Sequence, residues 1–203
     1  MPKTIVRYGQ RYVLAAGAIN WSLVASEALA LGLSALWRLD GNRTGQLVLI
    51  SQGKVFQSAV GSFYWQRLVK AKTPVFFINS GVLRVLRGRY LGVLGYALVL
   101  EHLKQKFNGW AAPEQEFGSE TSDAALRVWD SLKSSGELKS ATVEVPVLYG
   151  DTDQPLGTHP ATVYQWRGRL SVAALIDKRR ADAEQLEDPV WHASPPAYFD
   201  SRR

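Results

Sequence analysis

Cysteine is absent from the 203-residue chain, and its absence removes several chemistries at once. Without a thiol there is no disulfide framework, no thiolate zinc site, no iron–sulfur cluster and no cysteine nucleophile. A chain without cysteine also fits a reducing compartment, where disulfides are rare. We therefore expect a cytoplasmic protein.

The sequence also lacks a long uninterrupted apolar run. Its most membrane-like segment, Tyr90–Leu100, is eleven residues long and is flanked by Arg89 and Glu101. A membrane span needs about 20 apolar residues, so this segment predicts a buried helix. Near the N-terminus, Arg7 and Arg11 interrupt a short apolar stretch, which leaves no signal-peptide core of the usual length. We expect a soluble protein without a membrane partner.

Familiar catalytic motifs are missing as well. The chain has no Gly-rich phosphate-binding loop, no H-E-x-x-H zinc motif and no G-x-S-x-G nucleophile motif. Its three histidines, His102, His159 and His192, lie far apart in sequence, and each is better explained as a surface or structural residue than as a metal ligand. We therefore expect no cofactor, and a non-catalytic protein more readily than an enzyme.

Asp151 and Asp153, in YGDTDQPLG, form the best carboxylate cluster. Two carboxylates at the end of a strand can hold a divalent cation that activates water for phosphodiester cleavage. The same letters also make an ordinary turn, because Asp bonds its own backbone while Gly and Pro close the bend. The turn is the preferred interpretation, and a metal site is the alternative.

Acidic residues are scarce in the middle of the chain. Residues 67–107 carry eight cations and one acid, whereas residues 108–160 carry three cations and nine acids. The net charge of residues 67–107, +7, exceeds the +6 of the whole chain. A basic region attracts polyanions, and nucleic acid is the commonest polyanion in a cell. The alternative is that folding scatters these cations over several faces.

Two stretches combine the chemistry that nucleic acid requires. Phe63–Lys72, FYWQRLVKAK, sets three rings beside three cations, and Arg84–Arg89 contains three arginines. Rings can stack on unpaired bases while cations contact phosphates. Alternatively, Phe63 and Trp65 fill the core and the cations are only solvated. We expect the first stretch to place at least one ring in the core and to offer a basic edge to a polyanion. The predicted nucleic-acid-binding residues are Tyr64, Trp65, Arg67, Lys70, Lys72, Arg84, Arg87 and Arg89.

A pair of glycines, Gly92 and Gly95, lies in the apolar segment GVLG. The spacing resembles the backbone-clamping turn of some RNA-binding modules. Its neighbours are apolar rather than basic, so close packing of a helix is the better explanation.

The mixture of helical and strand patterns predicts an α+β fold, with antiparallel hairpins packed on about three to four helices. Predicted helices occupy residues 20–39, 82–107 and 122–136, the first and last capped by Asn20 and Ser122. Predicted strands occupy residues 46–50, 54–60, 73–79, 141–150, 161–166 and 169–175. The first two strands and the last two are expected to form hairpins, and Pro146 indicates an edge strand or a bulge.

The composition changes to Pro, Gly and Glu in residues 109–120, which predicts a loop and the best candidate boundary. Residues 1–110 would form a basic N-terminal α+β region. Residues 111–203 would form a C-terminal region with one helix, a hairpin and a Pro-rich tail. One continuous compact domain is the alternative to two small lobes.

These features favour a non-catalytic nucleic-acid-binding protein that acts as a subunit of a larger nucleoprotein complex. RNA-guided DNA-targeting complexes and plasmid or phage DNA-processing assemblies have requirements of this kind. RNA or DNA and other protein subunits are the expected partners. The first alternative is a metal-dependent nuclease or phosphotransfer enzyme that uses Asp151 and Asp153. The second is a structural interaction protein.

Overall fold

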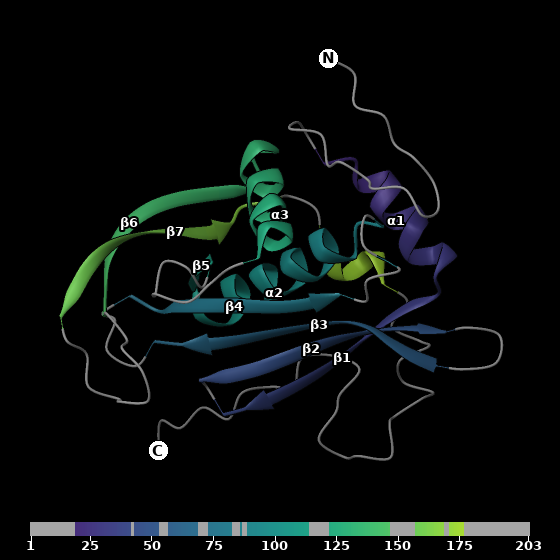
Figure 1. The fold of residues 1–203 in the computed structure, drawn as a ribbon, viewed down its shortest axis with the longest axis horizontal. Coiled ribbons are helices and arrows are strands. Elements are labelled where there is room, and N and C mark those ends of the chain that lie inside the picture. The colour runs from purple at the N-terminus through teal and green to yellow at the C-terminus, as the bar shows by residue number, and fades with distance from the viewer. Residues whose placement is uncertain are drawn as a thin grey trace.

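A seven-stranded sheet, in the order β1-β2-β3-β4-β5-β7-β6, forms the centre of the computed structural model (Figure 1). The structure describes residues 19–41, 43–52, 57–68, 73–82, 86, 89–113, 122–146, 157–168 and 171–176. The strands are β1 Leu33–Asp40, β2 Thr44–Gln52, β3 Gln57–Arg67, β4 Val75–Val82, β5 Trp110–Pro113, β6 Leu138–Pro146 and β7 Thr158–Trp166. Neighbouring strands pair antiparallel except β4 and β5, which are parallel.

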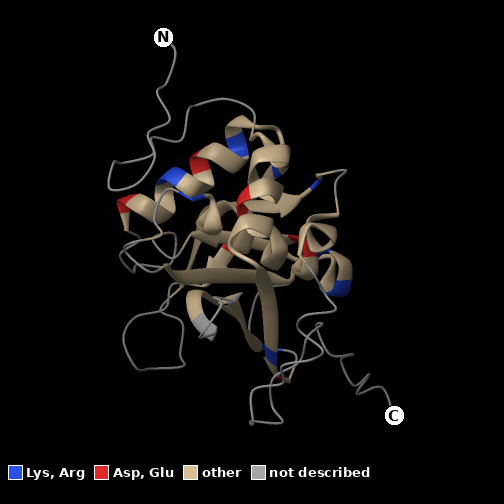
Figure 2. Ribbon diagram, turned by 90° about the vertical axis from the view of Figure 1, so that its right-hand side faces the viewer, with Lys and Arg blue, Asp and Glu red and all other residues tan. Residues whose placement is uncertain are grey.

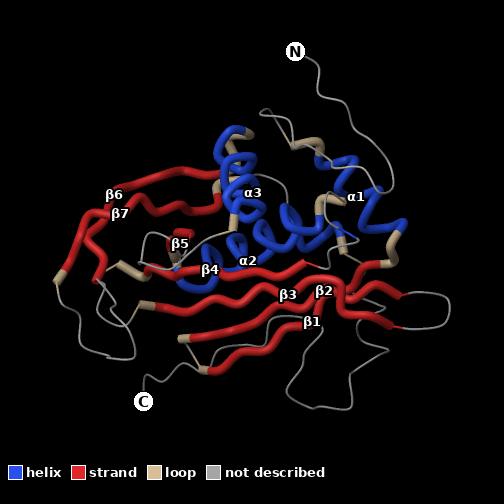
Figure 3. Tube along the Cα trace, in the orientation of Figure 1, coloured by secondary structure: helices blue, strands red, loops and turns tan. Residues whose placement is uncertain are grey.

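Three α-helices, α1 Trp21–Ala30, α2 Leu91–Phe107 and α3 Asp123–Ser134, lie on one face of the sheet (Figures 1 and 3). A short 3₁₀ helix, η3 Val172–Leu175, packs beside α2. The chain passes from β4 through α2 to β5, so α2 is the crossover that joins two parallel strands. Twelve of the seventeen residues of α2 are buried, because the sheet lies on one side and the other helical elements on the rest.

Local sequence signals fix the ends of these helices. The Asn20 side chain accepts a hydrogen bond from the Leu23 N–H at 3.1 Å, and the Ser122 hydroxyl accepts one from the Ala125 N–H at 3.3 Å. Both predicted N-caps are therefore confirmed. At the end of α2, Asn108 adopts a left-handed conformation with φ of 50°. That conformation is typical of a helix C-terminus.

The main core fills the space between the sheet and the helices. Its largest fully buried side chains include Trp65, Trp129, Tyr96, Phe63 and Phe76. A second, smaller apolar cluster lies on the opposite face of the sheet, at the end formed by β4, β5, β7 and β6. Its buried members are Leu68, Val75, Ala112, Val145, Ala161 and Val163.

The mixed α/β class agrees with the prediction. The sheet, however, makes up more of the fold than the predicted hairpins packed on three to four helices would. The predicted helix 20–39 is wrong in its second half. Helix α1 ends at Ala30, Gly32 turns with φ of 55°, and β1 follows from Leu33. A glycine in the left-handed conformation is a common helix stop, since it has no Cβ to clash.

Three further predictions of elements need correction. The helix predicted from residue 82 begins at Leu91, because Val82 ends β4 and Tyr90 has a left-handed conformation with φ of 60°. Residues 110–113 form β5 rather than part of a loop, and residues 172–175 form η3 rather than a strand. The partners of β7 are β6 and β5, so residues 161–166 form no hairpin with residues 171–175, the described part of the predicted last strand. The hairpin of β2 and β3 is confirmed, as is the edge position of β6, which ends at Pro146.

The proposed division near residue 110 stays a prediction, although β4 and β5, from its two sides, pair in one sheet. Within the described residues, every helix is too short or too polar to cross a membrane.

Candidate nucleic-acid interface

Strand β3 divides its side chains between two environments. Phe63 and Trp65 are 0% and 1% exposed and point towards α2, whereas Tyr64 and Gln66 are partly exposed on the opposite face. Successive residues of a strand point to opposite faces, so the row of three rings has to be split. The expectation that at least one ring lies in the core is confirmed, and Tyr64 is the ring that remains accessible.

A polar row crosses four strands on the side of Tyr64. Arg38 pairs with Gln46, Gln46 with Tyr64, and Tyr64 with Asn79, so the four side chains share one face of β1–β4. The described helices all lie on the other face (Figure 1). We call this surface the open face and define it by the partly or fully exposed residues Arg38, Gln46, Tyr64, Gln66, Phe77 and Asn79.

Phe77 supplies a second ring that sequence reasoning missed. It lies on β4 with its ring centroid 6.4 Å from that of Tyr64, at an interplanar angle of 52°. Its neighbour Phe76 is 0% exposed and belongs to the core. The signal was weak, because Val75–Ile78 is a continuous apolar run without alternation.

A third ring, Trp110 on β5, continues the line of rings beyond Phe77. Both residues pack against the smaller apolar cluster, and both are partly exposed. The Lys139 ammonium of β6 lies over the Trp110 ring, 4.9 Å from its centroid. Three rings on adjacent strands therefore lie between two cations, Arg38 at one side and Lys139 at the other.

Hydrogen bonds hold the polar groups of the open face in place. The Gln46 Nε2–H donates to the Ser62 hydroxyl at 2.7 Å, and the Tyr64 hydroxyl donates to Gln66 Oε1 at 3.3 Å. Burial and the nearby Asp40 carboxylate raise the pKa of Tyr64, so its phenol is neutral at pH 7. The Arg38–Asp40 pair, at 3.5 Å, is solvent-exposed and contributes little to stability.

The remaining predicted site residues do not all join this surface. Trp65 lies in the core, where its ring contacts Trp37 and His102, so it presents no face to a base. Arg67 ends β3 opposite Phe76, on the helical side of the sheet. The Arg89 guanidinium is bound to the Glu27 carboxylate of α1 at 2.7 Å, and only 22% of its side chain is exposed.

Lys70, Lys72, Arg84 and Arg87 lie outside the described residues, as do Asp151 and Asp153. In the part that is described, Lys and Arg are interspersed with Asp and Glu over the helices and the strand ends (Figure 2). The four described cations of residues 67–107 occupy the end of β3, the turn before α2 and the last turn of α2. This part of the chain therefore does not gather them into one patch.

Metal-binding chemistry finds no support in the described ranges, where no three His, Asp or Glu side chains come together. His102 is 5% exposed and its ring contacts those of Trp37 and Trp65, with centroids 5.2 and 5.6 Å away. Burial, with a smaller contribution from Lys106, lowers the pKa of His102 to about 4. This histidine is a neutral core residue at pH 7.

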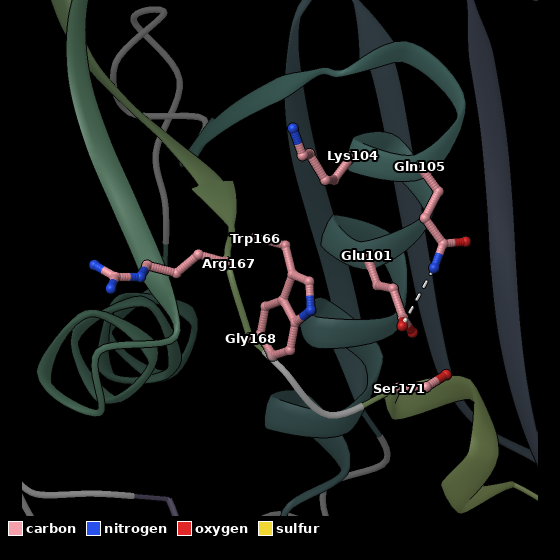
Figure 4. A pocket seen from close by; sticks show the side chains of 7 residues that line it. All are labelled: Glu101, Lys104, Gln105, Trp166, Arg167, Gly168 and Ser171. Atoms are coloured by element: carbon pink, nitrogen blue, oxygen red, sulfur yellow. Dashed lines mark hydrogen bonds between the residues drawn. The ribbon is translucent and has the colours of Figure 1, made fainter.

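A shallow pocket of about 390 Å³ lies between the last turns of α2 and the end of β7 (Figure 4). It is lined by Glu101, Lys104, Gln105, Trp166, Arg167, Gly168 and Ser171. The Glu101 carboxylate accepts hydrogen bonds from the Ala173 backbone N–H at 3.1 Å and from Gln105 at 3.4 Å. The lining residues include no histidine and one carboxylate, that of Glu101, which these two hydrogen bonds already engage.

Comparisons of the chain with family models, curated proteins and solved structures found no match. A function therefore has to be inferred from the residues of this chain alone.

Proposed function

We propose that the protein binds nucleic acid without catalysing a reaction, as a subunit of a larger nucleoprotein assembly. The observation that carries the proposal is the pair of partly exposed rings, Tyr64 and Phe77, on a sheet face that the described helices leave uncovered. Base–aromatic stacking contributes about 1–3 kcal/mol per base. A rigid sheet presents such rings at little cost in conformational entropy.

Charge supports the same proposal. Arg38 belongs to the open face, and Arg43 is exposed in the turn between β1 and β2. The net charge of +6 favours association with a polyanion at moderate ionic strength. The acidic residues of the 108–160 segment offer complementary charge for protein partners, which is the basis for proposing a subunit. The metal-dependent enzyme remains an alternative that depends on Asp151 and Asp153.

Fluorescence anisotropy of the full chain with labelled DNA and RNA oligonucleotides tests the proposal. We expect binding at low salt that weakens as salt rises, because phosphate contacts release counterions. Arg38→Ala should weaken binding. It should also make the dependence of affinity on salt shallower, by the amount that about one phosphate contact contributes. Arg127→Ala, which removes an exposed cation from α3, is the matched control and should bind like the parent chain. Absence of binding to every oligonucleotide at low salt would contradict the proposal.

Purification of the protein from its native source tests the assembly. We expect co-purifying proteins and nucleic acid, with part of the assembly lost after nuclease treatment. A monomer that purifies free of both would argue for a solitary role.

A further inference from the structure

We infer that the open face takes an unpaired nucleotide strand rather than a duplex. The inference rests on the proposed function and specifies its substrate class. It follows from how the rings are spaced, how deeply they are set and how wide the surface around them is.

The rings follow a diagonal across three adjacent strands. Tyr64 is opposite Asn79 on β4, and Phe77 lies two residues from Asn79. Phe77 is in turn opposite Ala112 on β5, and Trp110 lies two residues from Ala112, in the same direction because β4 and β5 are parallel. Diagonal neighbours in a sheet are about 7–8 Å apart. The three rings therefore follow one diagonal line across the sheet.

The depth of the rings excludes the wedge mechanism that some proteins use on duplex DNA. Wedging side chains project from the surface and enter between stacked base pairs. Tyr64, Phe77 and Trp110 are each partly buried, and the last two pack against the smaller apolar cluster. Rings set into the sheet in this way can contact only bases that are already unstacked.

The width of the surface is a second argument against a duplex. Strands β1 to β4 alone span roughly 14 Å from first to last, at about 4.8 Å per step. The major groove is about 12 Å wide and admits a helix or a two-stranded ribbon. A sheet face of four or more strands cannot enter it, so the rings could not reach paired bases.

The polar neighbours of the rings fit the edges and phosphates of a single strand. Gln46 and Asn79 flank Tyr64 in its row, and their amide groups offer both donors and an acceptor to a base edge. Lys139, over the Trp110 ring, and Arg38, beside Gln46, provide cations for phosphates at the two sides of the line of rings. A strand that crosses the sheet from β1 towards β6 would meet all of these groups.

The test compares unpaired and paired oligonucleotides on the same protein. Labelled 12-mers of deoxythymidine and of uridine, and a hairpin duplex, are titrated with the full chain at matched salt. We expect the single strands to bind at least about tenfold more tightly than the duplex. Comparison of the deoxythymidine and uridine strands shows whether the protein prefers DNA or RNA. Equal or tighter binding of the duplex overturns this inference but leaves the proposed function standing. No binding of any arm at low salt overturns both.

Variants of Tyr64 identify the surface. Tyr64→Ala should weaken single-strand binding by about 5- to 150-fold, the range that loss of one stacked base implies. Tyr64→Phe keeps the ring and should change binding by less than about threefold. Leu29→Ala removes an apolar side chain that is 80% exposed on α1, and it should bind like the parent chain. Single-strand affinity that is unchanged in a folded Tyr64→Ala variant would overturn the inference.

Photocrosslinking provides a readout that does not depend on affinity. Strands that contain 5-iodouracil should crosslink to peptides that carry Tyr64, Phe77 or Trp110. Crosslinks confined to α1 or α3 would place the strand on the helical side of the molecule and overturn the inference.

Discussion

The two faces of strands β1–β4 share one backbone but have different surroundings. On the helical face, Phe63 and Trp65 are almost completely buried and pack against Tyr96, Trp37 and the His102 ring. On the open face, the residues that alternate with them are amides, an arginine and two partly exposed rings, whereas Ser34, Leu36 and Ile50, further along β1 and β2 on the same side, are buried. Residues one position apart therefore differ sharply in how far they are buried.

This contrast shows how a short aromatic run can supply both a core and a surface. A strand needs only period-two alternation to bury one side chain and expose the next. Residues on the helical face cannot change without a cost in packing. The polar residues of the open face, such as Gln46 and Asn79, can change at a smaller cost in packing.

The sharpest test of the contrast is a pair of substitutions on neighbouring residues. Trp65→Ala should lower the free energy of unfolding by about 3–5 kcal/mol, because it leaves a large cavity in the core. Tyr64→Ala should lower it by about 1 kcal/mol, because its ring is only partly buried. Urea denaturation measures both. Similar losses for the two variants would contradict the division between the faces.

A second prediction concerns acid and the buried His102. Its folded pKa of about 4 lies below the ordinary 6.5, so protonation favours the unfolded chain. Neutral His102 therefore makes its full contribution to the free energy of unfolding above pH 6.5. That contribution falls as the pH is lowered from 6.5 to 4, by about 3 kcal/mol in total. Denaturation at a series of pH values measures the fall.

His102→Phe is the control for that prediction. The variant should show a smaller loss of stability between pH 7 and pH 4 than the parent chain, whatever its stability at pH 7. Identical pH profiles would show that His102 is not the group responsible.

The smallest expected effect compares two glycines on α2. A Cβ at Gly95 would overlap the Phe63 ring, whereas one at Gly92 would lie 3.0 Å from Val128 Cγ2. Gly95→Ala should lower the free energy of unfolding by about 1–2 kcal/mol, after the gain in helix propensity is counted. Gly92→Ala should be nearly neutral. If Phe63→Leu in the Gly95→Ala background fails to recover part of the loss, the ring is not the obstacle.

Those glycines also show what the sequence could settle. Their apolar neighbours predicted close helix packing, and the structure confirms it through Phe63 and Val128. The caps of α1 and α3 and the β2–β3 hairpin were also predictable, because each depends on residues near one another in the chain. Such features can be predicted because the interactions that form them join residues close together in the sequence.

Elements that depend on distant partners were not predictable. Strand β1 was taken for helix because both of its faces are buried, as Ser34 and Leu36 show, so no alternation marked it. Strand β5 has only four residues and is defined by its pairing with β4 and β7. No property of those four residues alone distinguishes them from a loop.

Of the three rings in the candidate site, only Tyr64 was predicted from the sequence. Alternation required Tyr64 to oppose Phe63 and Trp65, but the sequence did not say which side the helices would cover. Phe77 and Trp110 join Tyr64 only because β3, β4 and β5 are adjacent. The adjacency of β4 and β5 depends on the crossover through α2, which no local pattern reports.

The short strand β5 also determines where the sheet is expected to open first. On one side of it, β1–β4 are joined by connections between strands that are consecutive in sequence; on the other, β6 and β7 form a local pair. Within the sheet, these blocks are linked by four residue pairs from β4 to β5 and by the Ala111–Tyr164 pair from β5 to β7. Partial opening should therefore follow this line, with amide hydrogens of β6 and β7 exchanging as one unit while β2 and β3 stay protected.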